Sequence, residues 1–290
     1  MTNLRDLKNR QRTTHLIKRM TGAMGMIARA RYMTASGLHR HNALGLESLQ
    51  QLASHLWQQA REQEVSLPSL CSSGCPDLPW LLVVLSSQSG LCGGFNTQII
   101  ARAKTWLAEQ SVQSVPPLVL FVGKKGRRAL EKDSRWHPVG LDQDWHAGRW
   151  IEYVRDQLCA HTIRGASVLY SRYVNAIKQE PWVTPVLPLS FESCVPAPED
   201  SSTVVQWHVE PNMPVVLDAV ADRLYHTWCQ VIETEHQLSE HAARMQAMNT
   251  AHDNAKDMLQ SLQIQYNRLR QDRITKELIE IVAGSQNSGA

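Results

Sequence analysis

The sequence predicts an α/β fold: a long antiparallel coiled coil from the N- and C-terminal helices, plus a central Rossmann-like α/β domain. Three observations support this prediction. Residues 215–283 contain neither proline nor glycine. A second segment with helical periodicity lies at the opposite end of the chain. Between these two segments, strand-like and helix-like runs alternate, which is typical of a doubly wound domain.

The C-terminal segment, from Pro214 to Gly284, has the heptad spacing of a coiled coil. Apolar or small residues recur there at alternating steps of three and four, which keeps one seam facing a partner helix. At about 1.5 Å per residue, such a helix extends roughly 100 Å, so it needs a partner along its length. We predict that His252 is a polar interruption of the seam that tunes its register. The seam comprises Met245, Met248, His252, Ala255, Leu259, Leu262, Tyr266 and Leu269.

The N-terminal segment, residues 3–60, is predicted to be mostly helical and to be that partner. Apolar residues keep the same spacing at Ile17, Met20, Met24 and Ile27. Gly22 and Gly25 interrupt this part, each at a cost of about 1 kcal/mol relative to Ala. We expect them to soften the helix, or to let another backbone approach closely. Gly37 and Gly45 flank a less periodic stretch that leaves room for a kink.

Residues 78–195 are predicted to form the α/β domain. Residues 65–79 are rich in turn-forming types and mark a linker, and residues 193–212 have the composition of a loop. The resulting division is 1–62 for the N-terminal helix, 78–195 for the domain and 210–290 for the C-terminal helix. The expected strands are 80–85, 118–122, 166–173 and 183–189, and the expected helices are 96–110, a short basic helix after 123–126, and 147–162.

The charge of the chain is unevenly distributed. The formal net charge is only +3, yet residues 1–61 carry ten Lys and Arg against Asp6 and Glu47. A basic arm implies an acidic partner, such as nucleic acid, anionic lipid or an acidic protein surface. The longest apolar run, Leu78 to Leu85, is too short to span a bilayer, so we expect a soluble or peripheral protein.

The six cysteines give no metal-binding pattern. Cys71 and Cys75 are separated by three residues rather than two, and no second Cys/His pair stands at zinc spacing. We therefore expect no metal site and reduced thiols.

Two short segments have compositions that suit phosphate binding. The glycine-rich stretch Ser86–Asn96 follows a strand and opens a helix, but it lacks Gly-Lys-Ser/Thr and the Gly-x-Gly-x-x-Gly spacing. A tight, closely packed strand-to-helix turn is the preferred interpretation. The basic loop Gly123–Arg128 is interpreted as a solvated surface turn, with contact to phosphates or to an acidic neighbour as the alternative.

No catalytic constellation stands out in the sequence. There is no His-Glu-x-x-His, no Gly-x-Ser-x-Gly and no marked pair of carboxylates. We expect neither a catalytic site nor a bound cofactor in this chain.

Six blocks stand in order along the chain: Arg19–Ala28, Gly90–Asn96, Ser239–Met248, Asp253–Ala255, Tyr266–Gln271 and Ile274–Gly284. Together they closely resemble the gamma subunit of F-type ATP synthases. The sequence departs from the usual family pattern at Gln88-Ser89, where Asp-Arg is usual, and at Gly22 and Gly25, where charged residues are common. These departures indicate a divergent or alternate form.

This resemblance implies a central-stalk, or rotor-shaft, subunit that couples ion flow through a membrane ring to ATP synthesis or hydrolysis by rotation. It implies a peripheral position at the cytoplasmic face of the bacterial inner membrane. The implied partners are the alpha and beta subunits, the epsilon subunit and the ring of c subunits, with no nucleic acid and no small-molecule substrate. By the family motif, the expected shaft-to-ring contacts are Met24, Arg270, Gln271, Thr275, Glu277 and Glu280.

Two other functions compete with this one. The basic N-terminal arm suits a coiled-coil protein that binds nucleic acid or serves as a scaffold, although no recognition fold is visible. The glycine-rich turn alone suggests a nucleotide-binding enzyme. A regulatory or sodium-coupled variant of the rotary machine is a third possibility within the family.

Overall fold

The computed structural model describes residues 4–66, 68–110, 115–130, 137–139, 148–189 and 207–287. The chain forms two compact units. We call residues 1–29 with 244–290 the terminal unit, and residues 30–243 the central unit. Two long helices, α1 (Leu4–Glu62) and α6 (Met213–Asn287), contribute residues to both units.

Both terminal segments are helical, as predicted. Helix α6 begins one residue before Pro214, where a proline is tolerated because the first turn has no intrahelical acceptor for its nitrogen. The Asn212 side chain caps this start, since its Oδ1 accepts a hydrogen bond from the Val215 amide at 3.1 Å. Helix α1 continues without interruption through Gly37 and Gly45.

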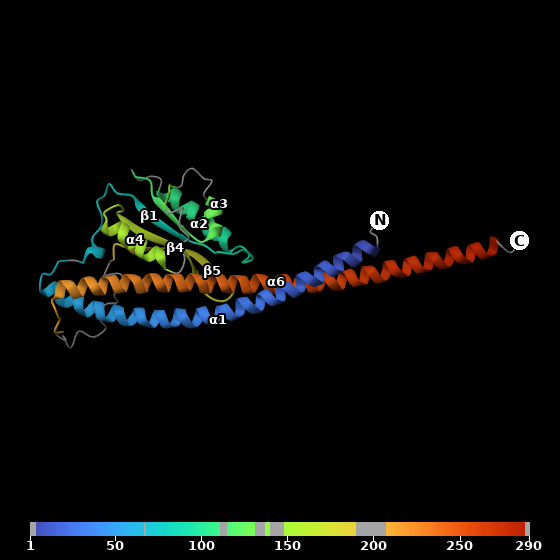
Figure 1. Ribbon diagram of the computed structural model, residues 1–290, viewed down its shortest axis with the longest axis horizontal. Helices are drawn as coiled ribbons and strands as arrows, with labels where there is room; N and C mark the ends of the chain where they lie inside the picture. The colour runs from blue at the N-terminus through green and yellow to red at the C-terminus, as the bar shows by residue number, and fades with distance from the viewer. Residues whose placement is uncertain are drawn as a thin grey trace. The chain divides into compact units, whose positions relative to one another are not determined.

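The described residues of the central unit form one five-stranded sheet with the order β3-β2-β1-β4-β5. Strands β1, β4 and β5 of this sheet are labelled in Figure 1. Strands β3, β2, β1 and β4 are parallel, and β5 runs antiparallel to β4. Strand β3 was not predicted, and β5 begins four residues earlier than the predicted residue 183. The strands are β1 (Trp80–Leu85), β2 (Leu118–Val122), β3 (His137–Val139), β4 (Gly165–Tyr173) and β5 (Gln179–Leu187).

Helices cover both faces of this sheet. On one face, Leu82 and Val84 of β1 pack with α2 (Phe95–Gln110), and α3 (Lys124–Leu130) lies against α2. On the other face, Leu81 and Val83 pack with α4 (Arg149–Cys159) and with the parts of α1 and α6 that belong to this unit. Burial on both faces explains why β1 is a continuous apolar run rather than an alternating one.

Some predicted boundaries need correction. The predicted basic loop Gly123–Arg128 is mostly helix, because α3 begins at Lys124. The predicted linker 65–79 contains a short 3-10 helix, η1 (Ser69–Cys71). Most of the predicted loop 193–212 lies outside the described residues.

Candidate functional site

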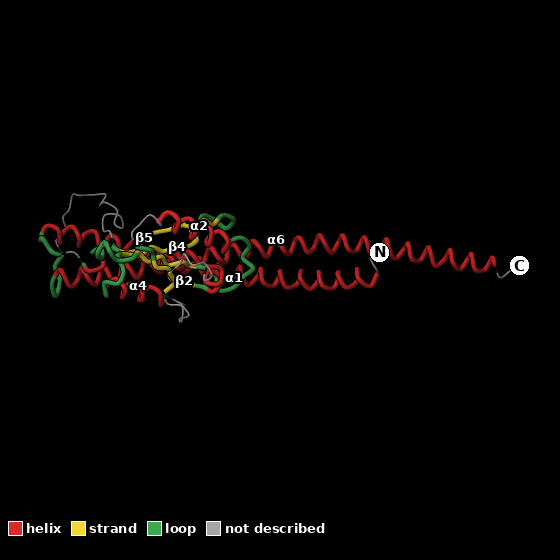
Figure 2. Tube along the Cα trace, turned by 90° about the horizontal axis from the view of Figure 1, so that it is seen from above, coloured by secondary structure: helices red, strands yellow, loops and turns green. Residues whose placement is uncertain are grey.

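In the terminal unit, the two helices pack against each other in opposite directions, as predicted (Figure 2). The side-chain Nε2 of Gln11 donates to Gln263 Oε1 at 3.1 Å. Further along α1, the Lys18 carbonyl lies 3.0 Å from His252 Nδ1. Because a carbonyl only accepts, Nδ1 of His252 carries the proton in this bond. The seam histidine therefore fixes the register of the pair by a bond to the opposite backbone.

The predicted seam of α6 faces α1. All eight of its residues are buried or half-buried, while most residues between them are exposed. Small side chains make up much of the contact, so the two backbones come close. Among its described residues, the terminal unit buries Leu7, Thr14, Gly25 and Ala28 on α1, with Arg244, Met248, Ala255 and Leu262 on α6.

The two N-terminal glycines, Gly22 and Gly25, face α6. A Cβ at Gly22 would lie 3.2 Å from His252 Nδ1 and 3.3 Å from its Cε1. At Gly25, a Cβ would lie 3.3 Å from Asn249 Oδ1 and 3.6 Å from Met248 Cβ. The distances of 3.2 and 3.3 Å are shorter than ordinary contacts of a carbon atom, whereas 3.6 Å is an ordinary contact. The geometry thus supports close approach, rather than softening, as the reason for these glycines.

A groove of about 800 Å³ runs between the two helices of the terminal unit. Leu262 is buried and Met258 is exposed within it, and Arg10 and Asp257 supply charges of both signs. Such a groove suits a protein side chain with an apolar body better than a strongly charged ligand.

The end of α6 has no buried residue from Gln263 to Ile281. Tyr266 and Leu269 are half-buried, but Ile264 and four large apolar side chains beyond Gln271 are exposed to between 48% and 67%. Exposed apolar side chains gathered in one stretch mark an interaction site. The four beyond Gln271 are Ile274, Leu278, Ile279 and Ile281.

The structure places five of the six predicted contact residues on this exposed end and one elsewhere. Arg270, Gln271, Thr275, Glu277 and Glu280 are all exposed on α6. The Thr275 hydroxyl donates to the Gln271 carbonyl at 3.0 Å, and Arg273 Nε donates to Glu277 Oε1 at 2.8 Å.

Met24 is half-buried in the helix pair, beside Gly25. Because Gly25 faces Met248, Met24 lies roughly 40 Å along the α6 axis from Thr275. The six residues therefore do not form one site, and their contact roles stay predictions.

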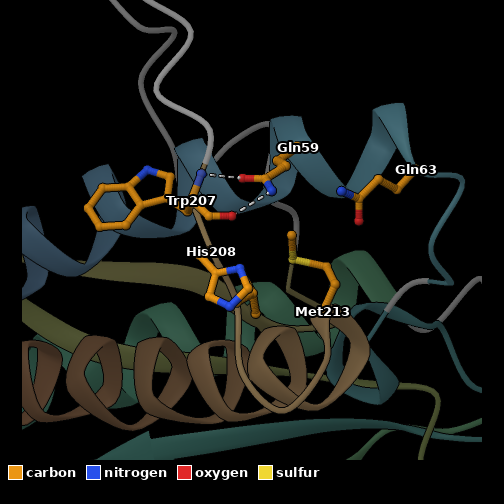
Figure 3. Close-up of a pocket in the computed structure, with 6 residues that line it drawn as sticks. Gln59, Gln63, Trp207, His208 and Met213 are labelled. Carbon is orange, nitrogen blue, oxygen red and sulfur yellow. Dashed lines mark hydrogen bonds between the residues drawn. The ribbon is translucent and has the colours of Figure 1, made fainter.

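A smaller cavity, of about 380 Å³, lies in the central unit where the chain enters α6 (Figure 3). There the Gln59 side chain forms two hydrogen bonds with the backbone of Trp207. Its Nε2 donates to the Trp207 carbonyl at 2.9 Å, and its Oε1 accepts from the Trp207 amide at 3.0 Å. This pair fastens the segment before α6 to the end of α1. The cavity is lined by Gln59, Gln63, Trp207, His208, Val209 and Met213.

The glycine-rich turn uses its polar groups internally. The Ser87 amide donates to Asn96 Oδ1 at 3.1 Å, and Asn96 Nδ2 donates to Ser87 Oγ at 2.8 Å. The Gly126 amide donates to Ser86 Oγ at 2.9 Å. At Gly123, where φ is +98°, a Cβ would lie 2.0 Å from the Ser86 carbonyl oxygen. The strand-to-helix turn is confirmed, but the close packing lies at Gly123 and Gly126. A Cβ at Gly90 would meet nothing closer than 3.5 Å, and one at Gly94 would meet nothing within 4 Å.

Helix α6 also occupies the place where doubly wound sheets usually bind ligands. That place is the crevice at the carboxyl ends of the strands where the strand order reverses, here between β1 and β4. The buried His236 of α6 accepts a hydrogen bond from the Ser171 amide at 3.2 Å, and its ring lies 5.3 Å from that of Phe95. Burial lowers the pKa of His236 to about 3, so the ring is neutral at physiological pH.

Within the residues that the structure describes, no helix is both long and apolar enough to span a membrane. The same residues contain no cluster of three or more His, Cys, Asp or Glu suited to a metal ion.

Comparisons with known proteins identify the family. A family model described as ATP synthase matches residues 3–287. The ATP synthase gamma chain of Fuscovulum blasticum is 34% identical over 295 residues, covering 99% of both chains. That of Jannaschia sp. (strain CCS1) is 32% identical over 298 residues, with the same coverage. The chain belongs to the ATP synthase gamma chain family.

Solved structures share the gamma-chain fold. A chain in the rotor of the Euglena gracilis mitochondrial ATP synthase aligns with a TM-score of 0.60 at 18% identity, covering 93% of this chain and 98% of that one. A chain from another rotational state of the same enzyme aligns with a TM-score of 0.50 at 19% identity, covering 91% and 94%. Gamma-chain membership does not favour the alternative of a nucleic-acid-binding coiled coil.

Proposed function

We propose that this gamma chain is the central-stalk, or rotor-shaft, subunit of an F-type ATP synthase. It couples ion flow through a membrane ring to ATP synthesis or hydrolysis at the beta subunits by rotation. The observation that carries the proposal is the family match over residues 3–287, combined with an apolar end of α6 that lies exposed.

The physical properties of the terminal unit suit this role. Two helices locked in register by a seam resist twisting better than one helix does. The exposed side chains of Ile274, Leu278 and Ile281 suit a sleeve of apolar side chains contributed by the alpha and beta subunits. Because apolar contacts are non-directional, such a sleeve holds the helix without fixing its angle.

The remaining assignments follow from the same role. Phosphoryl transfer belongs to the beta subunits, and this chain is non-catalytic. The chain is peripheral, at the cytoplasmic face of the bacterial inner membrane, with the epsilon subunit and the c ring as further partners. The division into 1–62, 78–195 and 210–290 corresponds to helix, head and helix. The contact residues are Met24, Arg270, Gln271, Thr275, Glu277 and Glu280.

Co-expression with alpha and beta subunits tests the proposal. The native chain should co-purify with them and yield a complex that hydrolyses ATP. Truncation before Ile274 should weaken assembly or coupling while the free chain keeps its unfolding temperature, because residues 274–281 are all exposed.

A full-length variant sharpens this test. Replacing Ile274, Leu278 and Ile281 with Ser should weaken assembly as the truncation does. The matched control replaces Asp272 and Lys276, which are exposed in the same stretch, with Ser and should assemble normally. Normal assembly and coupling of the apolar-to-Ser variant would contradict the sleeve, and absence of any complex with the native chain would contradict the central-stalk role.

A further inference from the structure

Strand β4 is longer than its parallel neighbour β1. The two strands pair from Trp80 with Gly165 to Val84 with Leu169, and β1 ends at Leu85. Strand β4 continues to Tyr173. On the β1 side, the last part of β4 therefore extends past the strand that would accept its amide hydrogens.

The prolines of β5 show which way these amides point. Ser171 lies opposite Pro181, and Ser167 lies opposite Pro185. Proline has no amide hydrogen, so these pairs are not hydrogen-bonded ones, and their backbone groups point away from each other. The amides of Ser171 and, two residues on, Tyr173 consequently face the β1 side of the sheet.

Two consecutive residues of α6 accept these amides. His236 Nδ1 accepts from the Ser171 amide at 3.2 Å, and Glu235 Oε1 accepts from the Tyr173 amide at 3.0 Å. The Glu235 carboxylate also bonds to Tyr170, whose pKa is raised to about 12 by burial and then by that charge. The two side chains thus take the place of the missing continuation of β1.

The other long helix is tied to the same strand end. The hydroxyls of Tyr32 on α1 and Tyr173 on β4 lie 2.7 Å apart. Other polar ties hold the earlier part of α6. The Tyr225 hydroxyl donates to the Ile151 carbonyl of α4 at 2.9 Å, and Asp222 accepts from Arg155 of α4 at 3.2 Å. Among these ties, the Glu235–His236 pair lies closest to Arg244, roughly 12 Å away along α6, where the terminal unit's part of the helix begins.

We propose that Glu235 and His236 form a clamp that sets the rotational angle of α6 relative to the sheet. Through this clamp, torque passes between the sheet of the central unit and the helix pair of the terminal unit. This proposal rests on the proposed rotor function. Elsewhere, α6 packs on the sheet through apolar residues such as Leu224 and Ile232. Apolar packing does not fix orientation strongly, whereas hydrogen bonds to fixed amides are directional. Glu235 and His236 are therefore positioning residues.

The test compares variants that keep or lose the acceptors. His236→Asn with Glu235→Gln keeps an acceptor oxygen at each position, and His236→Leu with Glu235→Met removes both at similar volume. Hydrogen exchange on the full chain should show roughly tenfold faster exchange of the Ser171 and Tyr173 amides in the Leu/Met variant alone. In membranes carrying the assembled enzyme, that variant should pump roughly two- to tenfold fewer ions per ATP hydrolysed, with hydrolysis itself maintained.

The outcomes separate the clamp from the rotor function. If the Leu/Met variant exchanged the Ser171 and Tyr173 amides faster but pumped as many ions per ATP as the native enzyme, the clamp would be overturned and the rotor function left intact. Equal loss of pumping in the Asn/Gln variant would also overturn it, since the acceptors would then not matter. If the native enzyme neither assembled nor pumped, the proposed function itself would fail. If the Leu/Met variant does not fold, the single variants Glu235→Met and Glu235→Gln are compared instead. Glu235 is half-buried, so either substitution disturbs the core less than a change at His236.

Discussion

His236 shows how one side chain connects folding to pH. Its Nδ1 accepts the Ser171 amide, so protonation would place a second donor against that amide as well as a charge in a buried site. Burial lowers the pKa of the ring to about 3 from an ordinary value of 6.5. Between these two values the unfolded chain binds a proton at this position and the folded chain does not.

The folded state should therefore lose stability as pH falls from about 6.5 toward 3. The slope reaches at most about 1.4 kcal/mol per pH unit, or about 2 kcal/mol between pH 7 and pH 5. Urea unfolding of the native chain and of His236→Asn at both pH values measures this contribution, because all other titrating groups are shared. The native chain should lose more stability than the variant, and parallel pH profiles would contradict the assignment.

At the scale of elements, helix α1 contains glycines that pack closely against α6 and glycines that do not. Gly22 and Gly25 face α6 at distances too short for an easy Cβ, whereas a Cβ at Gly37 or Gly45 would meet nothing within 4 Å. All four glycines lie inside the same helix. Replacement by Ala gains up to about 1 kcal/mol of helix propensity at each position, which close contact can cancel.

We expect Gly37→Ala with Gly45→Ala to raise the stability of the chain by about 1–2 kcal/mol. Gly22→Ala with Gly25→Ala should give no gain or a loss, because His252 and Asn249 must move. Thermal unfolding followed by helical circular dichroism compares the two double variants. Similar stabilisation by both pairs would show that the helices are not tightly packed at Gly22 and Gly25.

The elements that the sequence revealed are those with strong patterns. The apolar run of β1 and the heptads of α6 each carry many residues with one consistent signal. Strand β3 has three residues including Pro138, and β5 opens with Gln179 and Glu180, so neither offers a strand pattern where it begins. As an edge strand, β5 also tolerates prolines that usually argue against a strand.

The candidate site, too, has parts that a sequence pattern predicts and parts that no pattern predicts. The α6 seam follows from periodicity, and the structure confirms it residue by residue. The matching prediction for α1 was wrong, because Ile17, Met20 and Ile27 are exposed and only Met24 is half-buried. The clamp had no sequence signal, because Glu235 and His236 bond to backbone amides more than 60 residues earlier, and backbone groups leave no trace in a sequence. Which residues of the helix end touch a ring depends on partner surfaces that lie outside this chain.

At the scale of the whole molecule, the two units differ in how much apolar surface they bury. The central unit has cores on both sides of a sheet, with large buried side chains such as Trp150 and Tyr225. Among its described residues, the terminal unit has only eight buried ones, and half of these are small, such as Gly25, Ala28 and Ala255. Burial of apolar area is the main source of stability, so the terminal unit should open more easily.

Hydrogen exchange on the full chain should therefore show two levels of protection. Amides of α1 before Arg29 and of α6 after Arg244 should exchange at least roughly tenfold faster than those of β1 and β4. Assembly with alpha and beta subunits should slow exchange in the terminal unit while leaving β1 and β4 little changed, because binding stabilises the region that it covers. Equal protection of both units in the free chain would mean that the helix pair is stable without partners, and that its exposed end needs no sleeve to remain helical.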